Sequence, residues 1–193
     1  MSADVDIDLA DRTQLLNLIQ HIPARQVVDG QVRKHNSGVY ATSIPYDPIN
    51  ECASIDYKEA DKRGYFKIDL LNMHVYKLIK SREHYNEMLE REPTWSKLLD
   101  KEFCEKVVHV ANHHELLCKL KPDSIPRMAM FLALIRPAKR HLADKPWSEI
   151  SKDIWISPDD DSYFFKKSHA VGYAHLVALH INLLETNGEG STN

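Results

Sequence analysis

The stretch Tyr65-Phe66-Lys67-Ile68-Asp69-Leu70-Leu71 decides the fold class. It follows a charged segment, residues 59–64, that reads as a turn. The same pattern of a turn and an apolar run occurs earlier in the chain. Asp29-Gly30 is a turn signal, and a run of small, β-branched and aromatic residues extends from Gly38 to Ile44. Such residues between turn formers are typical of strands. We therefore predict a small, irregular β element near residues 26–71.

Helical patterns surround this element. Leucines and isoleucines within residues 9–22 have the spacing of a short amphipathic helix that ends at Pro23. From Met73 onward the apolar spacing is helical again. The predicted helices are Arg82–Glu92 behind Ser81, 101–110, 112–120, 125–135 with Ser124 as N-cap, and 168–185. We expect an α+β fold, mostly α-helical, divided into an N-terminal helix (1–24), a small β segment (25–72), a helical lobe (73–188) and a disordered tail (189–193).

Composition restricts the class of protein. The chain has 193 residues, of which 43% are hydrophobic and 27% charged, the balance of a soluble globular protein. Its net charge of −3 implies that any contact with nucleic acid depends on a local basic patch. The three cysteines show no C-x-x-C spacing, which favours a reduced, cytoplasmic setting. No apolar run reaches the roughly 18 residues of a membrane span.

Three blocks, in this order, carry a resemblance to a known family. The first pairs His35-Asn36-Ser37-Gly38-Val39 with Phe66-Lys67-Ile68-Asp69-Leu70-Leu71 about thirty residues later. The second runs from Leu120-Lys121-Pro122-Asp123-Ser124 to Ala133-Leu134-Ile135-Arg136-Pro137. The third is Phe164-Phe165-Lys166-Lys167-Ser168-His169-Ala170 and the residues after it. Together they resemble the alpha subunit of C-family bacterial DNA polymerase III over residues 33–184.

The resemblance implies a truncated piece of the palm and the base of the fingers. Because such short polymerase fragments are more easily explained in a phage genome, we expect a phage-encoded protein. It places the third catalytic aspartate of the palm at Asp69. The paired palm aspartates, the N-terminal phosphatase-like domain and the long fingers segment of the family have no counterpart that we identify. Two metal ions need several carboxylates, and Mg²⁺ binds weakly to one. We therefore expect Asp69 to hold Mg²⁺ only if a partner completes the site.

Basic residues gather near the matched blocks. In the family, these regions face the incoming nucleotide and the primer-template backbone. The start of the 168–185 helix is a ready anion site with lysines beside it, although the same lysines also suit a purely solvated helix start. The candidate phosphate or nucleic-acid contacts are Arg33, His35, Lys67, Arg136, Lys139, Arg140, Lys166, Lys167, Ser168 and His169.

Histidines offer a weaker metal hypothesis. His109 and His113 are four residues apart, but the sequence that follows lacks the H-E-x-x-H order of zinc proteases. His175 and His180 are five apart, which places them on different helix faces. Structural or surface roles are the better interpretation of all four.

These observations favour a replication-associated protein that binds DNA or docks with a DNA polymerase or another replisome protein, without polymerase activity of its own. In a split-enzyme version of this hypothesis, a partner supplies the missing aspartates. One alternative is an interaction module that modulates or inhibits a host replisome component. Another is a metal-dependent nuclease or phosphohydrolase that uses Asp69 and histidines.

Overall fold

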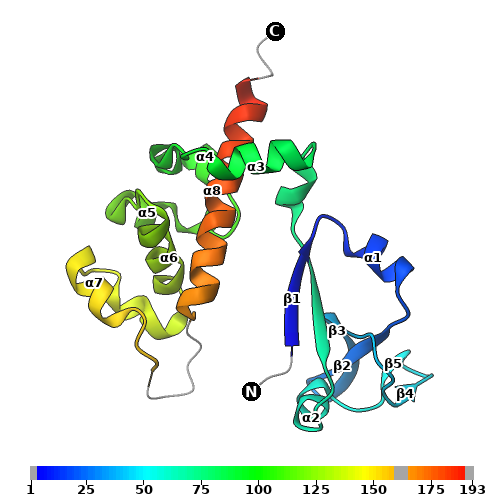
Figure 1. The fold of residues 1–193 in the computed structure, drawn as a ribbon. Helices are drawn as coiled ribbons and strands as arrows, with labels where there is room; N and C mark the ends of the chain where they lie inside the picture. Colours follow the sequence, from blue (N-terminus) through cyan, green and yellow to red (C-terminus); the bar gives the residue numbers. More distant parts are fainter. Residues whose placement is uncertain (1–3, 159–164, 190–193) are drawn as a thin grey trace. The chain divides into compact units, whose positions relative to one another are not determined.

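The computed structural model describes residues 4–158 and 165–189 (Figure 1). The chain divides into two compact units, one up to Leu78 and one from Ile79 onward. The first holds the sheet and the second is helical. The expected α+β class with a helical majority is confirmed. The division between the units falls six residues after the boundary at 72 that the sequence suggested.

A four-stranded sheet forms the first unit, with strand order β1-β6-β3-β2. Its strands are β1 (Asp4–Leu9), β2 (Ile22–Val28), β3 (Gln31–Tyr40) and β6 (Lys67–Asn72). β1 runs parallel to β6, whereas β3 is antiparallel to both β6 and β2. Residues Lys67 to Leu71 of β6 therefore lie in the interior of the sheet, between β1 and β3.

The N-terminal region differs from the helix expected over 1–24. Residues 4–9 form β1, and the helix α1 spans only Arg12–Leu18. The reason is a period of two: aspartates alternate with Val5, Ile7 and Leu9, and this pattern suits a strand. The carboxylate of Asp11 then accepts a hydrogen bond from the Thr13 N–H at 2.9 Å and begins the helix.

Turns and a small core complete this unit. The predicted turn at Asp29-Gly30 joins β2 to β3, and both residues have positive φ, 52° and 73°, as a two-residue hairpin requires. A second hairpin pairs β4 (Tyr46–Asp47) with β5 (Cys52–Ala53), and α2 (Tyr57–Lys62) follows. The buried side chains that pack together are Ala24, Tyr40, Ile44, Ala53 and Ala60.

The helical unit is built around α8 (Lys167–Glu189), with α6 (Ile125–Leu134) packed beside it (Figure 1). Both helices bury apolar faces in one core, which includes Met128, Phe131, Val177 and Ile181. The other helices are α3 (Arg82–Glu90), α4 (Lys101–Cys104), α5 (His114–Leu120) and α7 (Trp147–Asp153). Short 3-10 helices of this unit are η2 (Trp95–Leu99), η3 (Ala111–His113) and η4 (Pro137–Leu142), whereas η1 (His74–Leu78) ends the first unit.

The predicted helices differ from these mainly in length. Ser81, which precedes the expected helix, caps α3: its hydroxyl accepts from the His84 N–H at 3.2 Å. The helix expected over 101–110 ends at Cys104, because tight turns follow and His109 takes a left-handed conformation with φ 66°. Of the tail 189–193, only Glu189 is described, as the last residue of α8; residues 190–193 and Phe164 lie outside the described residues.

Candidate functional site

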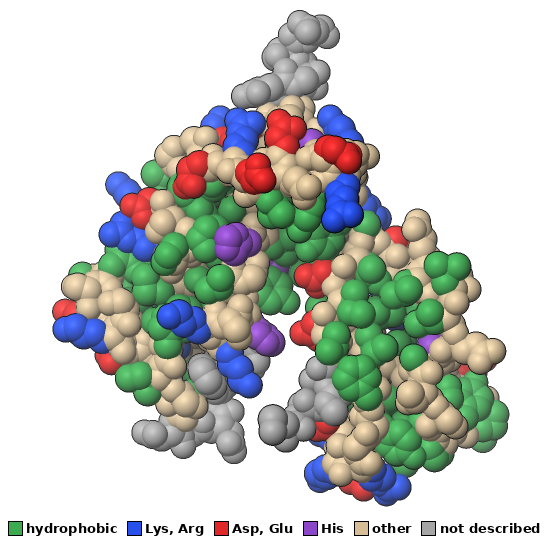
Figure 2. Space-filling view, viewed as in Figure 1, with side chains coloured by type: hydrophobic (Ala, Val, Ile, Leu, Met, Phe, Trp, Pro, Cys, Tyr) green, Lys and Arg blue, Asp and Glu red, His purple; other side chains and the backbone are tan. Residues whose placement is uncertain are grey.

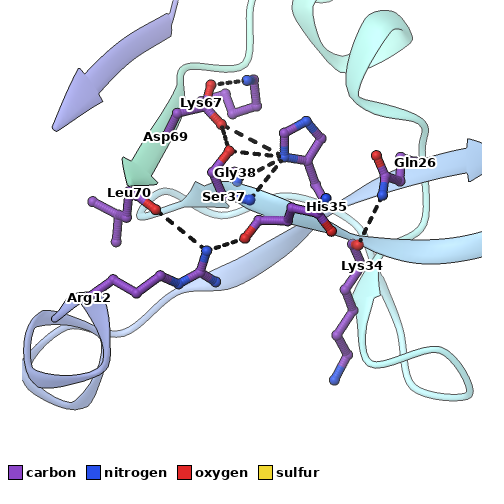
Figure 3. Close-up of polar contacts among 10 residues, drawn as sticks. Arg12, Gln26, Lys34, His35, Ser37, Gly38, Lys67, Asp69 and Leu70 are labelled. Atoms are coloured by element: carbon purple, nitrogen blue, oxygen red, sulfur yellow. Dashed lines mark hydrogen bonds and ion pairs between the residues drawn. The ribbon is translucent and has the colours of Figure 1, made fainter. Parts of the chain in front are cut away.

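Asp69 lies at the centre of a polar cluster on one face of the sheet (Figure 3). Its side chain is buried, with 7% of the residue exposed. One carboxylate oxygen accepts a hydrogen bond from the Ser37 hydroxyl at 2.7 Å, and the other is paired with the ammonium of Lys67. His35 Nδ1 lies 3.7 Å from the first oxygen. The structure thus brings together three residues that the sequence singled out, His35, Lys67 and Asp69.

The hydrogen bonds of His35 show that its ring is an acceptor at Nδ1. That nitrogen receives the Gly38 N–H at 2.9 Å and the Ser37 N–H at 3.3 Å. Burial, followed by the nearby Lys67 charge, lowers the pKa of His35 below its ordinary value, although Asp69 opposes this. The ring also packs edge-on against Tyr57, with centroids 5.0 Å apart. His35 therefore positions the β3 backbone next to Asp69 as a neutral imidazole.

A glycine is needed beside this cluster. Gly38 is the register partner of Asp69 on the neighbouring antiparallel strand. A Cβ at this position would lie 2.9 Å from Lys67 Cδ, 3.0 Å from His35 Nδ1 and 3.2 Å from Ala24 Cβ. The absent side chain leaves the space through which the aliphatic part of Lys67 reaches Asp69.

The environment of Asp69 stabilises its charged form. Burial alone would raise the pKa of this carboxyl, but the hydrogen bonds from Lys67 and Ser37 outweigh burial and lower the pKa below its ordinary value. The Asp69 carboxylate is therefore an anion that already has a cation beside it. A metal ion or a phosphate-bound cation that approached Asp69 would have to displace the Lys67 ammonium.

Two carboxylates that the sequence analysis missed stand on the adjacent strand. Asp6 of β1 is in register with Asp69, and Asp8 is in register with Leu71. Register partners on parallel strands project to the same face, as do residues two apart on one strand. Burial, followed by the charge of Asp6, raises the pKa of Asp8. The signal was the Asp-x-Asp-x-Asp alternation of residues 4–8.

Arg12 is a second residue that the sequence analysis missed. It begins α1, and its backbone N–H donates to the Asn72 side chain at 2.8 Å. Its guanidinium contacts the carbonyl oxygen of Asn36 and lies 3.4 Å from that of Leu70 (Figure 3). Arg12 therefore ties the start of α1 to β3 and β6, next to the Asp69 cluster.

The metal hypothesis finds limited support in this geometry. Over residues 4–158 and 165–189, no group of three or more His, Cys, Asp or Glu side chains is arranged to hold a metal ion. Asp6 and Asp69 would suit only a cation that takes most of its ligands from water or phosphate, as Mg²⁺ does. The fit is thus partial, and it requires Lys67 to leave Asp69.

The basic candidates of the helical unit divide by their exposure. Lys166, Lys167, Ser168 and His169 are all exposed at the start of α8. Lys139, in contrast, is buried, and its ammonium donates to the carbonyl oxygen of Asp153 at 2.8 Å. It therefore acts within the fold rather than on the surface.

Two arginines follow α6: Arg136 comes just before η4, and Arg140 lies within η4. The guanidinium of Arg136 is 4.7 Å from the centre of the Phe165 ring, and its buried Nε has no hydrogen-bond partner among the described residues. Phe165 in turn contacts His169, with ring centroids 6.3 Å apart, so Arg136 lies close to the exposed start of α8. Arg140 is exposed and donates from Nε to the carbonyl oxygen of Ile135 at 3.2 Å.

The remaining candidates lie in the other unit. Arg33 is exposed on β3 and donates to the Gln31 side chain at 3.1 Å. Like His35 and Lys67, it belongs to the sheet. The structure therefore divides the sequence candidates between the sheet unit, which holds Arg33, His35 and Lys67, and the helical unit, which holds the others.

The histidines take the structural roles that the sequence favoured. His109 packs edge-on against Tyr173 with centroids 4.5 Å apart, and burial, with Arg136 and His180, lowers its pKa to about 4. His180 is buried and accepts the Val108 N–H at 3.0 Å, whereas His175 is exposed on the opposite side of α8.

Comparison with known proteins identifies no relative: no protein-family model, no curated protein and no solved structure matches this chain. Across the described residues, no helix combines the length and apolar character that crossing a membrane requires.

Proposed function

We propose that this chain is a replication-associated DNA-binding protein, related to the polymerase III alpha subunit, that contacts the phosphate backbone through the start of α8. The observation that carries the proposal is the exposure of Lys166, Lys167 and His169 at the first turn of a 23-residue helix. In the described part of the chain, no acidic side chain pairs with either lysine. Free backbone N–H groups at a helix start and unpaired ammonium groups both favour phosphate.

The proposed contact is local. Figure 2 shows Lys and Arg side chains interspersed with Asp and Glu over the helical unit, on the face in view. A surface of this kind suits a few phosphate contacts rather than a long electrostatic track. Arg136, which contacts the Phe165 ring, lies near enough to the start of α8 to extend the contact by about one phosphate. The competing function is docking with a polymerase or another replisome protein, in which these cations contact protein or solvent only.

Fluorescence anisotropy with labelled primer-template, single-stranded and duplex DNA separates the two functions. DNA binding that weakens with salt supports the proposal, since each neutralised phosphate adds to the salt dependence. Absence of binding to all three DNAs at low salt contradicts it and leaves the protein-docking function.

A second candidate function, divalent-cation-dependent phosphoryl chemistry in the sheet unit, is favoured by one observation. Asp6 stands in register with Asp69 within this chain, so a second carboxylate needs no partner protein. A bound Mg²⁺ would supply charge stabilisation to phosphate oxygens. Asp6 and Asp69 would hold the cation, and Lys67, displaced from Asp69, would face the phosphate. Nucleotide incorporation or nuclease activity that persists in excess chelator would contradict this function.

A further inference from the structure

We propose that a cavity at the far end of α8 binds a nucleoside phosphate whose base carries an exocyclic amino group. The cavity has a volume of about 420 Å³ and lies between the end of α3, η2, α4 and the last turns of α8. From Lys167 to Glu185, α8 rises about 27 Å at 1.5 Å per residue. The site is therefore separate from the proposed DNA contact, and the inference does not depend on it.

A buried asparagine holds together two of the helices that surround this cavity. The side-chain amide of Asn182 donates to the carbonyl oxygens of Met88 at 2.9 Å and Arg91 at 2.8 Å, which fixes the end of α3 against α8. The guanidinium of Arg91 then donates to the Thr186 hydroxyl at 3.3 Å. Arg91 is thus held at the rim by its backbone and by its side chain.

Glu185 lines the cavity with a carboxylate whose Oε2 makes no hydrogen bond to any described residue. Only 6% of its side chain is exposed. Its Oε2 is buried without a hydrogen-bond partner, and the nearest cation, Arg91 NH2, is 3.8 Å away, beyond hydrogen-bonding distance. A buried carboxylate is costly unless donors satisfy it. The geometry therefore favours a ligand that presents an N–H donor to Glu185.

The remaining charged groups of the cavity are cationic. Lys97 and Lys106 are exposed and line it together with Arg91. Neither lysine pairs with an acidic side chain among residues 4–158 and 165–189. Three cations around one carboxylate give the cavity a net positive charge, within a chain whose overall charge is −3. The rim therefore suits an anionic group such as phosphate. Lysine binds phosphate as a point charge, and arginine binds it through two parallel N–H donors.

The apolar part of the lining selects a planar ligand. Phe103 and Leu184 are half-buried and line the same cavity. Aromatic side chains stack on nucleobases of any kind, and carboxylates accept hydrogen bonds from exocyclic amino groups such as that of cytosine. A volume of about 420 Å³ is also within the range of small-molecule sites, about 300–1,000 Å³. Inorganic phosphate alone would leave Glu185 without a donor and Phe103 without a contact.

Isothermal titration calorimetry on the full chain tests this site with CMP, AMP, GMP, UMP and inorganic phosphate. We expect the three amino-bearing nucleotides to bind at least fivefold more tightly than UMP, and inorganic phosphate to bind weakest. Lys97→Ala combined with Lys106→Ala should weaken CMP binding at least tenfold. Glu185→Gln should narrow the preference for CMP over UMP, because the amide offers an N–H to the uracil carbonyl.

Controls keep the result specific. Lys152→Ala removes an exposed lysine of α7 and should leave CMP binding unchanged. Circular dichroism on each variant shows that the fold is retained. The inference is overturned if no nucleotide binds at millimolar concentration, or if the Lys97 and Lys106 substitutions leave binding intact. It is also overturned if Lys166→Ala with Lys167→Ala abolishes CMP binding, since that result places the nucleotide at the start of α8.

Discussion

Asp6 and Asp69 lie in register on neighbouring parallel strands, so both carboxylates belong to one face of the sheet. Lys67, two residues before Asp69 on the same face, pairs with the Asp69 carboxylate and offsets part of this negative charge. The arrangement joins the first strand of the chain to a strand some sixty residues later. It makes the sheet unit a candidate for cation binding without a second protein.

Substitution of Asp6 tests that candidate. Asp6→Asn should weaken the binding of Mn²⁺, measured by electron paramagnetic resonance in the presence of DNA, at least tenfold, because one of the two carboxylates loses its charge. Lys67→Met should instead strengthen Mn²⁺ binding, because the competing ammonium is gone. Glu105→Gln, an exposed acid of the helical unit, serves as the control. Equal Mn²⁺ affinity in the wild type and Asp6→Asn would show that Asp6 is not a ligand.

Gly38→Ala should destabilise the sheet unit by about 1–3 kcal/mol, as overpacking does. The added methyl would lie 2.9 Å from Lys67 Cδ and 3.0 Å from His35 Nδ1, so the side chains around Asp69 must shift. Urea unfolding measures the change. The matched control is Gly172→Ala in α8, where a Cβ meets nothing within 4 Å; it should stabilise by about 0.5–1 kcal/mol. Unchanged stability of Gly38→Ala would mean that the close approach is not restrictive.

Asn182→Leu should lower the free energy of unfolding by about 1–3 kcal/mol, because the carbonyl oxygens of Met88 and Arg91 lose their donors. Asn187→Leu, at an exposed position of the same helix, should have little effect. Thermal and urea unfolding report both. Equal stability of the two variants would contradict the assignment of Asn182 as the tie between α3 and α8.

Which parts of this structure were predictable depends on how local their cause is. The Asp29-Gly30 turn, the start of α3 after Ser81 and the apolar character of α8 follow from neighbouring residues, and the sequence predicted each of them. β1 was missed because its alternating aspartates lack the apolar content expected of a strand. It is a strand because it pairs with β6, about sixty residues later in the chain, and that pairing is not visible in the local sequence. Lys139 has the composition of a surface contact, but the packing of η4 against α7 buries it. The cluster around Asp69 combines residues of β3 and β6, and the register between these strands determines which of their side chains meet.

Buried histidines predict a loss of stability in acid. His180 has an ordinary pKa near 6.5 when unfolded, and burial lowers it to about 4 in the folded protein. Between these values the unfolded chain binds more protons, so the free energy of unfolding falls as the pH decreases from 6.5 to 4. His180→Gln keeps an acceptor for the Val108 N–H and should reduce that fall, measured by urea unfolding at several pH values. His175→Gln, exposed on the same helix, should behave as the wild type. If the free energy of unfolding of His180→Gln depended on pH in the same way as that of the wild type, burial of His180 would not be the origin of the pH dependence.

The most direct test of the proposed function is the salt dependence of primer-template binding, measured by fluorescence anisotropy between about 50 and 200 mM salt. The account predicts that the wild type binds, and that Lys166→Ala with Lys167→Ala weakens binding and reduces the slope of log affinity against log salt by about 1–2. Lys152→Ala should retain both affinity and slope. Binding with an unchanged slope in the Lys166 and Lys167 variant, or no binding by the wild type at low salt, would contradict the assignment of the α8 start as a DNA contact.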